Sequence, residues 1–337
     1  MKKILLPVLF SLAVVTASSA AEPYHLLKEI PVGGDGGWDY LSVDSAAQRL
    51  YVSHASKVVV IDLAKDAVAG EITNTPGVHG LAPCPGLGLG VTSNGRENKA
   101  GIVDLKTLQT LSKVATGGNP DGMLYEPGQK EVYIFNGKGE SATVIDPKAG
   151  KVVATIPLGG KPEFAAADVK AGLVFNNLED KNEVVVIDTK THTVKNRWPI
   201  APGEEASGLA FDEKNHRLFL GCGGSKTMVM LDSTSGKVLA SVPIGDGVDA
   251  NSFDPATMLA FASCSDGTVT IAHEDGDKLT VVQTLKTQKG SRTMTIDPAT
   301  HKIYLAAAKF EEPAAGQRRG KMVAGSFKIL VYGRDDK

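Results

Sequence analysis

Seven positions in this 337-residue chain carry side chains suited to binding or acid–base chemistry, and they recur at a nearly constant spacing. Each follows the previous one by 40 to 44 residues; the set is Asp39, His79, Asp121, Glu163, Ser207, Asp249 and Arg292. Carboxylates that lie close together repel one another, so such a group either holds protons or attracts a cation. Oxygen ligands with one imidazole suit a hard divalent ion such as Ca²⁺, Mg²⁺ or Mn²⁺.

Side chains of both charges occur in this set, which favours a site for a ligand or a metal ion. Arg292 would either neutralise part of the negative charge or bind an anionic group. Trp38 and Phe164 are the sequence neighbours of two of the carboxylates. The predicted ligand-binding residues are Asp39, His79, Asp121, Glu163, Asp249, Arg292 and Trp38. The alternative is a hydrated rim whose charges water keeps apart, and the presence of a divalent metal at the acidic ring stays open.

A second set of carboxylates is the same in most repeats. An apolar run ends in aspartate five times, at intervals of 42 to 44 residues: Asp62, Asp104, Asp146, Asp188 and Asp232. Two further copies, which end at Ile271 and Val331, lack the aspartate. A side chain that nearly every repeat requires serves the repeat, so we expect these aspartates to accept hydrogen bonds from backbone N–H groups in turns.

The elements that must position both sets are short strands. Runs rich in Val, Ile, Leu and Tyr alternate with period two, and Asn-Gly or Asp-Gly turns separate them, as at residues 94–95 and 266–267. Four such strands per repeat, in seven repeats, predict an all-β fold, a seven-bladed β-propeller. The last repeat has only three strands, near 294–297, 302–306 and 326–332. The strand predicted from Tyr24 to Val32 therefore closes the last blade, which removes an open edge.

The repeat resembles that of a known family. The Val-Val-Ile-Asp strand at 59–62, the Gly-Gly-x-Pro turns at 117–120 and 159–162 and the Tyr-Val strand at 51–52 are similar to YVTN-repeat β-propellers. Among these, the exported bacterial YncE-like proteins are the most similar, over essentially the whole mature chain. The resemblance implies the propeller fold and export, and it implies no particular ligand.

The N-terminus is typical of a secretory signal. Lys2 and Lys3 precede an apolar run from Ile4 to Val15, and small residues follow up to Ala21. We predict a signal peptide at 1–21, then one seven-bladed domain at 22–337 with an insertion at 309–325 in the last blade. The apolar run is too short to span a bilayer. The expected location is the periplasm, with an extracellular location as the alternative.

Charge and cysteine content exclude some functions. The net charge of −2, from 36 basic and 38 acidic residues, argues against a nucleic-acid partner. Cys222 and Cys264 occupy equivalent places in neighbouring repeats, too far apart for a disulfide. They either bind a soft metal with His54 or pack as small buried residues, and we expect Cys84 to pack too.

These observations favour a binding module. We expect the protein to be a monomer that binds a small molecule or a protein partner at one mouth of the channel. The alternative is a metal-assisted lactonase or lyase, with His79 as general base and Glu163 or Asp121 holding the ion. No nucleophile motif assigns a catalytic residue. The charged insertion at 309–325 lies between a second and a third strand and is either functional or mobile.

Overall fold

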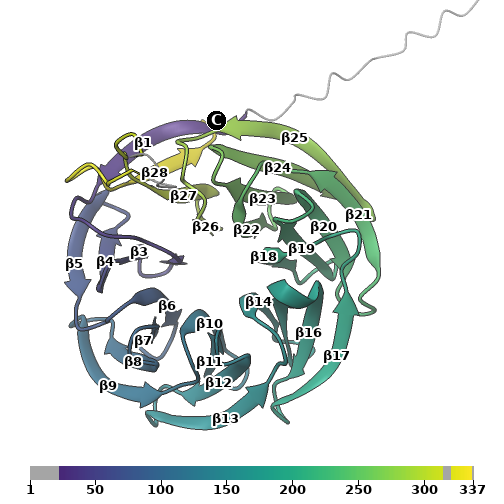
Figure 1. Ribbon diagram of the computed structural model, residues 1–337, viewed down its shortest axis with the longest axis horizontal. Coiled ribbons are helices and arrows are strands. Elements are labelled where there is room, and N and C mark those ends of the chain that lie inside the picture. The colour runs from purple at the N-terminus through teal and green to yellow at the C-terminus, as the bar shows by residue number, and fades with distance from the viewer. Residues whose placement is uncertain (1–22, 314–319, 336–337) are drawn as a thin grey trace, which may run out of the picture.

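The computed structural model describes residues 23–313 and 320–335, and in it seven four-stranded antiparallel sheets surround a central axis (Figure 1). From the axis outward, the first three blades contain β2–β5 (Leu41–Asp44, Arg49–His54, Lys57–Asp62, Ala67–Ile72), β6–β9 (Val78–Cys84, Leu89–Asn94, Lys99–Asp104, Gln109–Ala115) and β10–β13 (Pro120–Glu126, Glu131–Asn136, Ser141–Asp146, Lys151–Pro157). This arrangement confirms the predicted seven-bladed β-propeller. The predicted signal peptide lies outside the described residues.

The next three blades repeat this order without a break. They contain β14–β17 (Pro162–Asp168, Leu173–Leu178, Glu183–Asp188, Thr193–Pro199), β18–β21 (Ala206–Asp212, Arg217–Cys222, Thr227–Asp232, Val238–Pro243) and β22–β25 (Val248–Asp254, Leu259–Cys264, Thr268–Asp275, Lys278–Lys286). A single 3-10 turn, η1 (Glu179–Lys181), connects β15 to β16. Within the described ranges no helix is long and apolar enough to cross a membrane.

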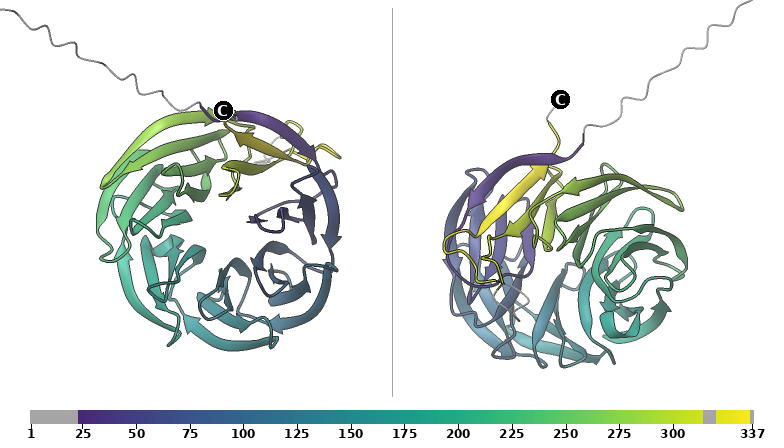
Figure 2. Two further views of the ribbon diagram at one scale, coloured as in Figure 1. Left: turned by 180° about the vertical axis from the view of Figure 1, so that it is seen from behind. Right: turned by 45° about the horizontal axis from the view of Figure 1, so that its top comes forward.

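The seventh blade joins the two ends of the chain. It contains β26 (Met294–Asp297), β27 (Lys302–Ala307), β28 (Lys328–Gly333) and, as its outer strand, β1 (His25–Pro31). β1 pairs antiparallel with β28, and Ile30 lies opposite Ile329. Figure 2 shows these first and last strands side by side in both views. The prediction that an N-terminal strand closes the last blade is confirmed.

Burial explains why the inner strands are continuously apolar. Each blade packs both of its faces against neighbouring blades, so the four residues from Val58 to Ile61 in β4 are all at most 1% exposed. The outer strand β5 has only Ile72 buried. The predicted packing role of the cysteines is confirmed, because Cys84, Cys222 and Cys264 are buried free thiols.

The repeated aspartates serve the turns between third and fourth strands, as predicted. Asp104 Oδ1 accepts hydrogen bonds from the backbone N–H groups of Lys106 at 2.9 Å and Thr107 at 2.7 Å. The other four repeats have the same pair of bonds, at Asp62, Asp146, Asp188 and Asp232. Because strands alternate in direction, these turns lie on the face opposite to the one where the innermost strands begin.

Candidate functional site

The seven variable positions all lie where an innermost strand begins, beside the central axis. Five of them are the second residue of β6, β10, β14, β18 or β22: His79, Asp121, Glu163, Ser207 and Asp249. Asp39 and Arg292 instead lie two residues before β2 and β26. In those five blades the innermost strand therefore begins one residue before the variable position.

A β-bulge places these five residues. In the second blade, Val78 pairs with Asn94 and Gly80 with Ser93, so His79 has no partner in the ladder. The register shifts at the same place in the four following blades. A bulged residue leaves the regular alternation of side chains, and bulges commonly redirect side chains next to functional sites. The repeat thus presents one variable side chain per blade to the channel mouth.

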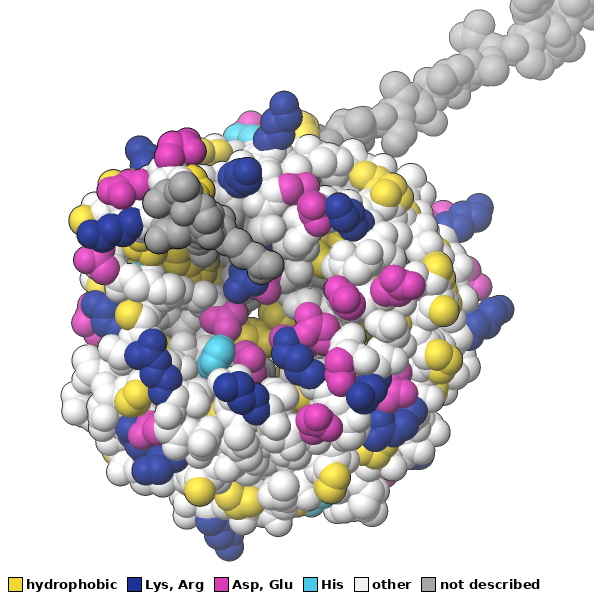
Figure 3. All heavy atoms as spheres, in the orientation of Figure 1, with side chains coloured by type: hydrophobic (Ala, Val, Ile, Leu, Met, Phe, Trp, Pro, Cys, Tyr) yellow, Lys and Arg dark blue, Asp and Glu magenta, His cyan; other side chains and the backbone are white. Residues whose placement is uncertain are grey.

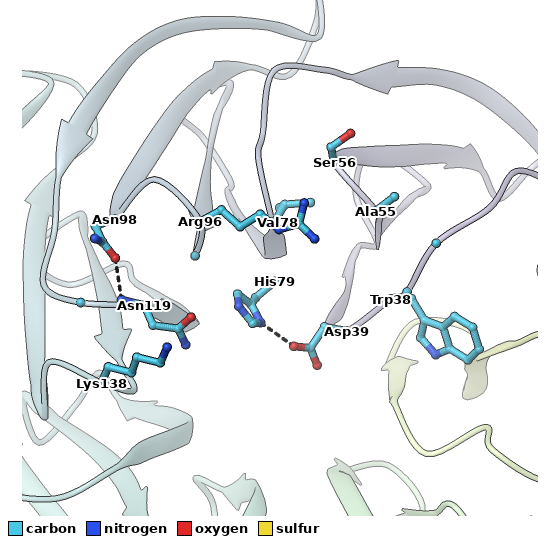
Figure 4. A pocket seen from close by; sticks show the side chains of 15 residues that line it. Trp38, Asp39, Ala55, Ser56, Val78, His79, Arg96, Asn98, Asn119 and Lys138 are labelled. Carbon is cyan, nitrogen blue, oxygen red and sulfur yellow. Dashed lines mark hydrogen bonds and ion pairs between the residues drawn. The ribbon is translucent and has the colours of Figure 1, made fainter. Parts of the chain in front are cut away.

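The first three blades bring an imidazole and two carboxylates together. His79 Nδ1 lies 2.7 Å from Asp39 Oδ2 and 3.2 Å from Asp121 Oδ1. Figure 4 shows the His79 ring directed at the Asp39 carboxylate. Within the described residues, this is the only group of three or more His, Cys, Asp or Glu side chains whose ligand atoms lie within 4.8 Å of one another. We call these three residues the His79 cluster.

The remaining carboxylates of the ring have cations of their own. Asp249 lies 3.3 Å from the Arg292 guanidinium and accepts a hydrogen bond from Thr293 at 2.6 Å. Glu163 lies 2.7 Å from the Lys161 ammonium, which also contacts a second glutamate. Lys161 was missed by the sequence analysis, although it lies two residues before Glu163 in a Gly-Gly-Lys-Pro turn.

Ser207 is the one ring position turned to the backbone. Its hydroxyl donates a hydrogen bond to the Asp249 carbonyl oxygen at 3.1 Å. It thereby links the fifth and sixth blades, and its role is structural.

Burial and charge shift the pKa values of the ring. Desolvation raises the pKa of Glu163 to about 8, and the Asp121 charge adds to this while Lys161 opposes it. Desolvation likewise raises the pKa of Asp121 to about 6, against the opposing effect of His79. Desolvation lowers the pKa of His79, but the hydrogen bond to Asp39 and the charge of Asp121 outweigh it, and the net shift is upward. Perturbed groups that share one concave surface mark a candidate site.

Two aromatic rings close the channel beneath the charges. Tyr40, from the first blade, and Phe164, from the fourth, have ring centroids 4.6 Å apart. Below them lies a separate cavity of about 360 Å³, lined mostly by apolar residues that include Leu81 and Ile296. Figure 3 shows acidic, basic and histidine side chains around the central opening and hydrophobic atoms at its bottom. The mouth is therefore a depression, called the cup below, whose floor is formed by Tyr40 and Phe164.

The Tyr40 hydroxyl is an anomaly in this floor. Its oxygen is buried and has no hydrogen-bond partner among the described residues. Desolvation, followed by the charges of Asp121 and Glu163, raises the pKa of Tyr40 well above 10. Burying an unpaired hydroxyl costs about 1–3 kcal/mol. The sequence analysis missed Tyr40. The only feature of the sequence that pointed to it is its position directly after Asp39.

A groove leads away from the His79 cluster over the first three blades. It is a cavity of about 830 Å³, and it is bounded by Asp39, His79, two cations and a series of glycines and polar residues that include Gly77, Gly95, Gly118, Asn98 and Asn119. The cations are Arg96 and Lys138, which Figure 4 shows around the same opening. A Cβ on Gly95 would lie 2.7 Å from His79 Nε2, so the imidazole requires glycine there.

Trp38 points away from the His79 cluster and toward the last blade (Figure 4). Its ring lies 5.1 Å from that of Phe327 and 6.1 Å from that of Phe310, centroid to centroid. Phe310 pairs with Met322 across the described parts of the insertion, and Trp38, Arg292 and these two residues line a cavity of about 270 Å³. The described parts of the insertion thus lie beside the face that carries the seven variable positions. Trp38 therefore lines the side of the cup, against Phe310 and Phe327, and does not lie among the charged residues at its centre.

Comparisons with known proteins support the fold. No family model matches the chain, and no curated protein matches it. The chain is similar to one from a solved structure entitled "Crystal Structure of Mitotic Checkpoint Complex", with a TM-score of 0.77 and 11% sequence identity, over 100% of this chain and 99% of that chain. At this identity the likeness shows a β-propeller and nothing finer, because one fold can carry many unrelated functions.

Proposed function

We propose that this protein is an exported binding module of the YVTN-repeat type that works in the periplasm as a monomer. It holds a small polar ligand, or a polar segment of a partner protein, in the cup and groove of its ring face. The observation that carries this proposal is convergence: a bulge in five blades, and the residues before the innermost strand in two others, bring unlike charged side chains over one closed floor.

The energetic cost of this arrangement supports a functional role. The side chains of Asp121, Glu163 and Asp249 are each only 13–14% exposed, and burial raises the pKa of all three. Each of these carboxylates has a cationic or imidazole partner, but the free energy of taking a carboxylate out of water often exceeds what such a pair returns. A residue that only filled space at these positions would be apolar. Groups retained at such a cost are typical of binding sites.

The test is a thermal-shift screen of the purified, mature protein. The panel covers divalent cations, dicarboxylates, polyamines, amino acids and sugars. The variant Asp121→Ala/Asp249→Ala removes two ring carboxylates, and the control variant Asp275→Ala/Asp277→Ala removes the same charge from a turn on the opposite face. We expect the ring variant to lose the stabilising shifts and the control to keep them. If the ring variant keeps every shift of the wild type, the proposed site is wrong.

A second candidate function is a metal-assisted lactonase or lyase. The His79 cluster favours it, because carboxylate and imidazole ligands with an open position are typical of catalytic metal sites. Because Nδ1 faces the two carboxylates, His79 could serve as a ligand through Nδ1 or as a base through Nε2. A lactone panel assayed with and without EDTA tests this function. Turnover equal in wild type and His79→Ala would contradict it.

A further inference from the structure

We infer that Asp39, His79 and Asp121 bind a divalent transition-metal ion of the Zn²⁺ or Mn²⁺ class, and that this ion, with Arg96 and Lys138, binds a carboxylate-bearing ligand in the groove. The inference rests on the proposed function and names the chemistry of its ligand. Three features carry it: the balance of charge in the ring, the unpartnered hydroxyl beneath it and the unpaired cations beside it.

The charge balance singles out this cluster. Asp249 and Arg292 form one neutral pair, and Glu163 shares with Glu179 the Lys161 ammonium, which has no lone pair to offer a metal ion. The His79 cluster instead has two carboxylates for one imidazole. It carries one negative charge if His79 is protonated and two if it is neutral. A divalent cation with a neutral imidazole and two carboxylates would be electrically balanced, and the imidazole would give up its proton to accept the ion.

The ligand types indicate which ions suit the site. Imidazole favours Zn²⁺ and other transition metals, while carboxylates also accept Mn²⁺. Three protein ligands leave at least one position open, as in catalytic zinc sites. The side chains are 14–25% exposed, so an ion can reach them from the groove.

The Tyr40 hydroxyl gives independent support. It is buried without a partner in the described part of the chain, and Tyr40 directly follows Asp39 in the sequence. Gly122, next to Asp121, is the close neighbour of this hydroxyl, because a Cβ there would lie 3.3 Å from the Tyr40 oxygen. A water or ligand oxygen bound to an ion at the cluster would supply the missing partner.

The groove supplies the second half of the inference. Arg96 and Lys138 line the same cavity as Asp39 and His79, and neither forms an ion pair with any described residue. Unpaired cations beside a metal with an open position select an anionic group that can bind both. A carboxylate is such a group. This arrangement explains how a ring rich in carboxylates can bind an anion.

The first experiment titrates Zn²⁺ and Mn²⁺ into untagged, EDTA-treated protein by isothermal titration calorimetry. We expect one site, weakened by about 100-fold or more in His79→Ala, since even partners that only orient a ligand contribute about 10–100-fold. Asp275→Asn is the control, because this exposed carboxylate lies in a turn on the opposite face, and we expect it to keep the wild-type affinity. Zinc-edge anomalous diffraction should place the ion between the three side chains.

The second experiment titrates succinate, a weak chelator, into the metal-loaded and the metal-free protein. We expect succinate to bind at least about tenfold more tightly to the loaded form, and Arg96→Ala/Lys138→Ala to lose this gain while it keeps its metal affinity. Metal affinity equal in wild type and in a folded His79→Ala variant would overturn the metal site. If the thermal-shift screen still finds ring-dependent ligands, the proposed function survives that result. Equal succinate binding by both forms would overturn the ligand assignment.

Discussion

His79 Nδ1 lies 2.7 Å from Asp39 Oδ2, although the two residues are 40 positions apart and belong to neighbouring blades. A backbone hydrogen bond from Tyr40 N–H to the His79 carbonyl oxygen, at 2.9 Å, fixes the same two segments. The Asp39 N–H also donates to the Ser53 hydroxyl at 2.8 Å. The contact between the two side chains is thus built into the packing of the first blade against the second.

Gly95→Ala should displace His79 without unfolding the propeller. The added Cβ would lie 2.7 Å from His79 Nε2, closer than real contacts allow, and the side chain must move. Gly137→Ala is the matched control, because it occupies the same Asn-Gly turn in the next blade and its Cβ has no atom closer than 3.6 Å. We expect Zn²⁺ affinity to fall by about tenfold or more in the first variant and to stay unchanged in the second. Calorimetry measures both, and equal affinities would contradict the geometry.

Tyr40→Phe should leave the free energy of unfolding unchanged or raise it by about 1 kcal/mol, because it removes a buried hydroxyl without a partner. Tyr24→Phe should lower it by about 1 kcal/mol, because the Tyr24 hydroxyl donates to the His301 carbonyl oxygen at 2.8 Å. Urea denaturation of the metal-free protein measures both changes. A loss in Tyr40→Phe as large as in Tyr24→Phe would mean that the Tyr40 hydroxyl is hydrogen-bonded in solution.

Glu274 should make the fold less stable as the pH rises. Burial raises its pKa from 4.5 to about 7, the Asp212 carboxylate adds to the shift, and Arg217 opposes it. Between these two pH values the folded state binds more protons than the unfolded chain. The free energy of unfolding therefore falls as the pH rises through this window, by up to about 3 kcal/mol.

Glu274→Gln should remove this part of the pH dependence, since the amide does not ionise. The measurement is urea denaturation at pH 5 and pH 8, with Asp275→Asn, an exposed neighbour, as the control. We expect the difference between wild type and Glu274→Gln to grow toward pH 8, where the wild type is the less stable of the two. A difference that is the same at both pH values would show that Glu274 is already ionised at pH 5.

Ile30→Ala should destabilise the protein by about 2–5 kcal/mol, because Ile30 is 1% exposed in the strand that closes the ring. Leu26→Ala, on the same strand, removes a side chain that is 44% exposed and should cost less than about 0.5 kcal/mol. Thermal denaturation compares the two. Equal losses would mean that β1 does not pack on β28 as the structure has it.

The sequence alone was sufficient for the architecture. Alternating apolar runs and turn residues act within a few positions of the chain, so the blades, the closing strand from Tyr24 to Val32 and the turn role of Asp104 could be predicted from local patterns. The variable positions could also be found, because aligned repeats place equivalent residues at one mouth of the ring. The export signal, the periplasmic location and the family resemblance stay predictions.

The tertiary structure decided how these residues combine. Which carboxylate pairs with which cation depends on the distance between blades, and no local pattern encodes that distance. The same holds for the floor formed by Tyr40 and Phe164, which come from blades on different sides of the axis. The direction of the Trp38 side chain could not be predicted for the same reason. It packs against Phe310 in the insertion and not beside its sequence neighbour Asp39. From the sequence we could predict His79 as a candidate site residue. The packing of three blades then brings its imidazole beside two carboxylates, those of Asp39 and Asp121.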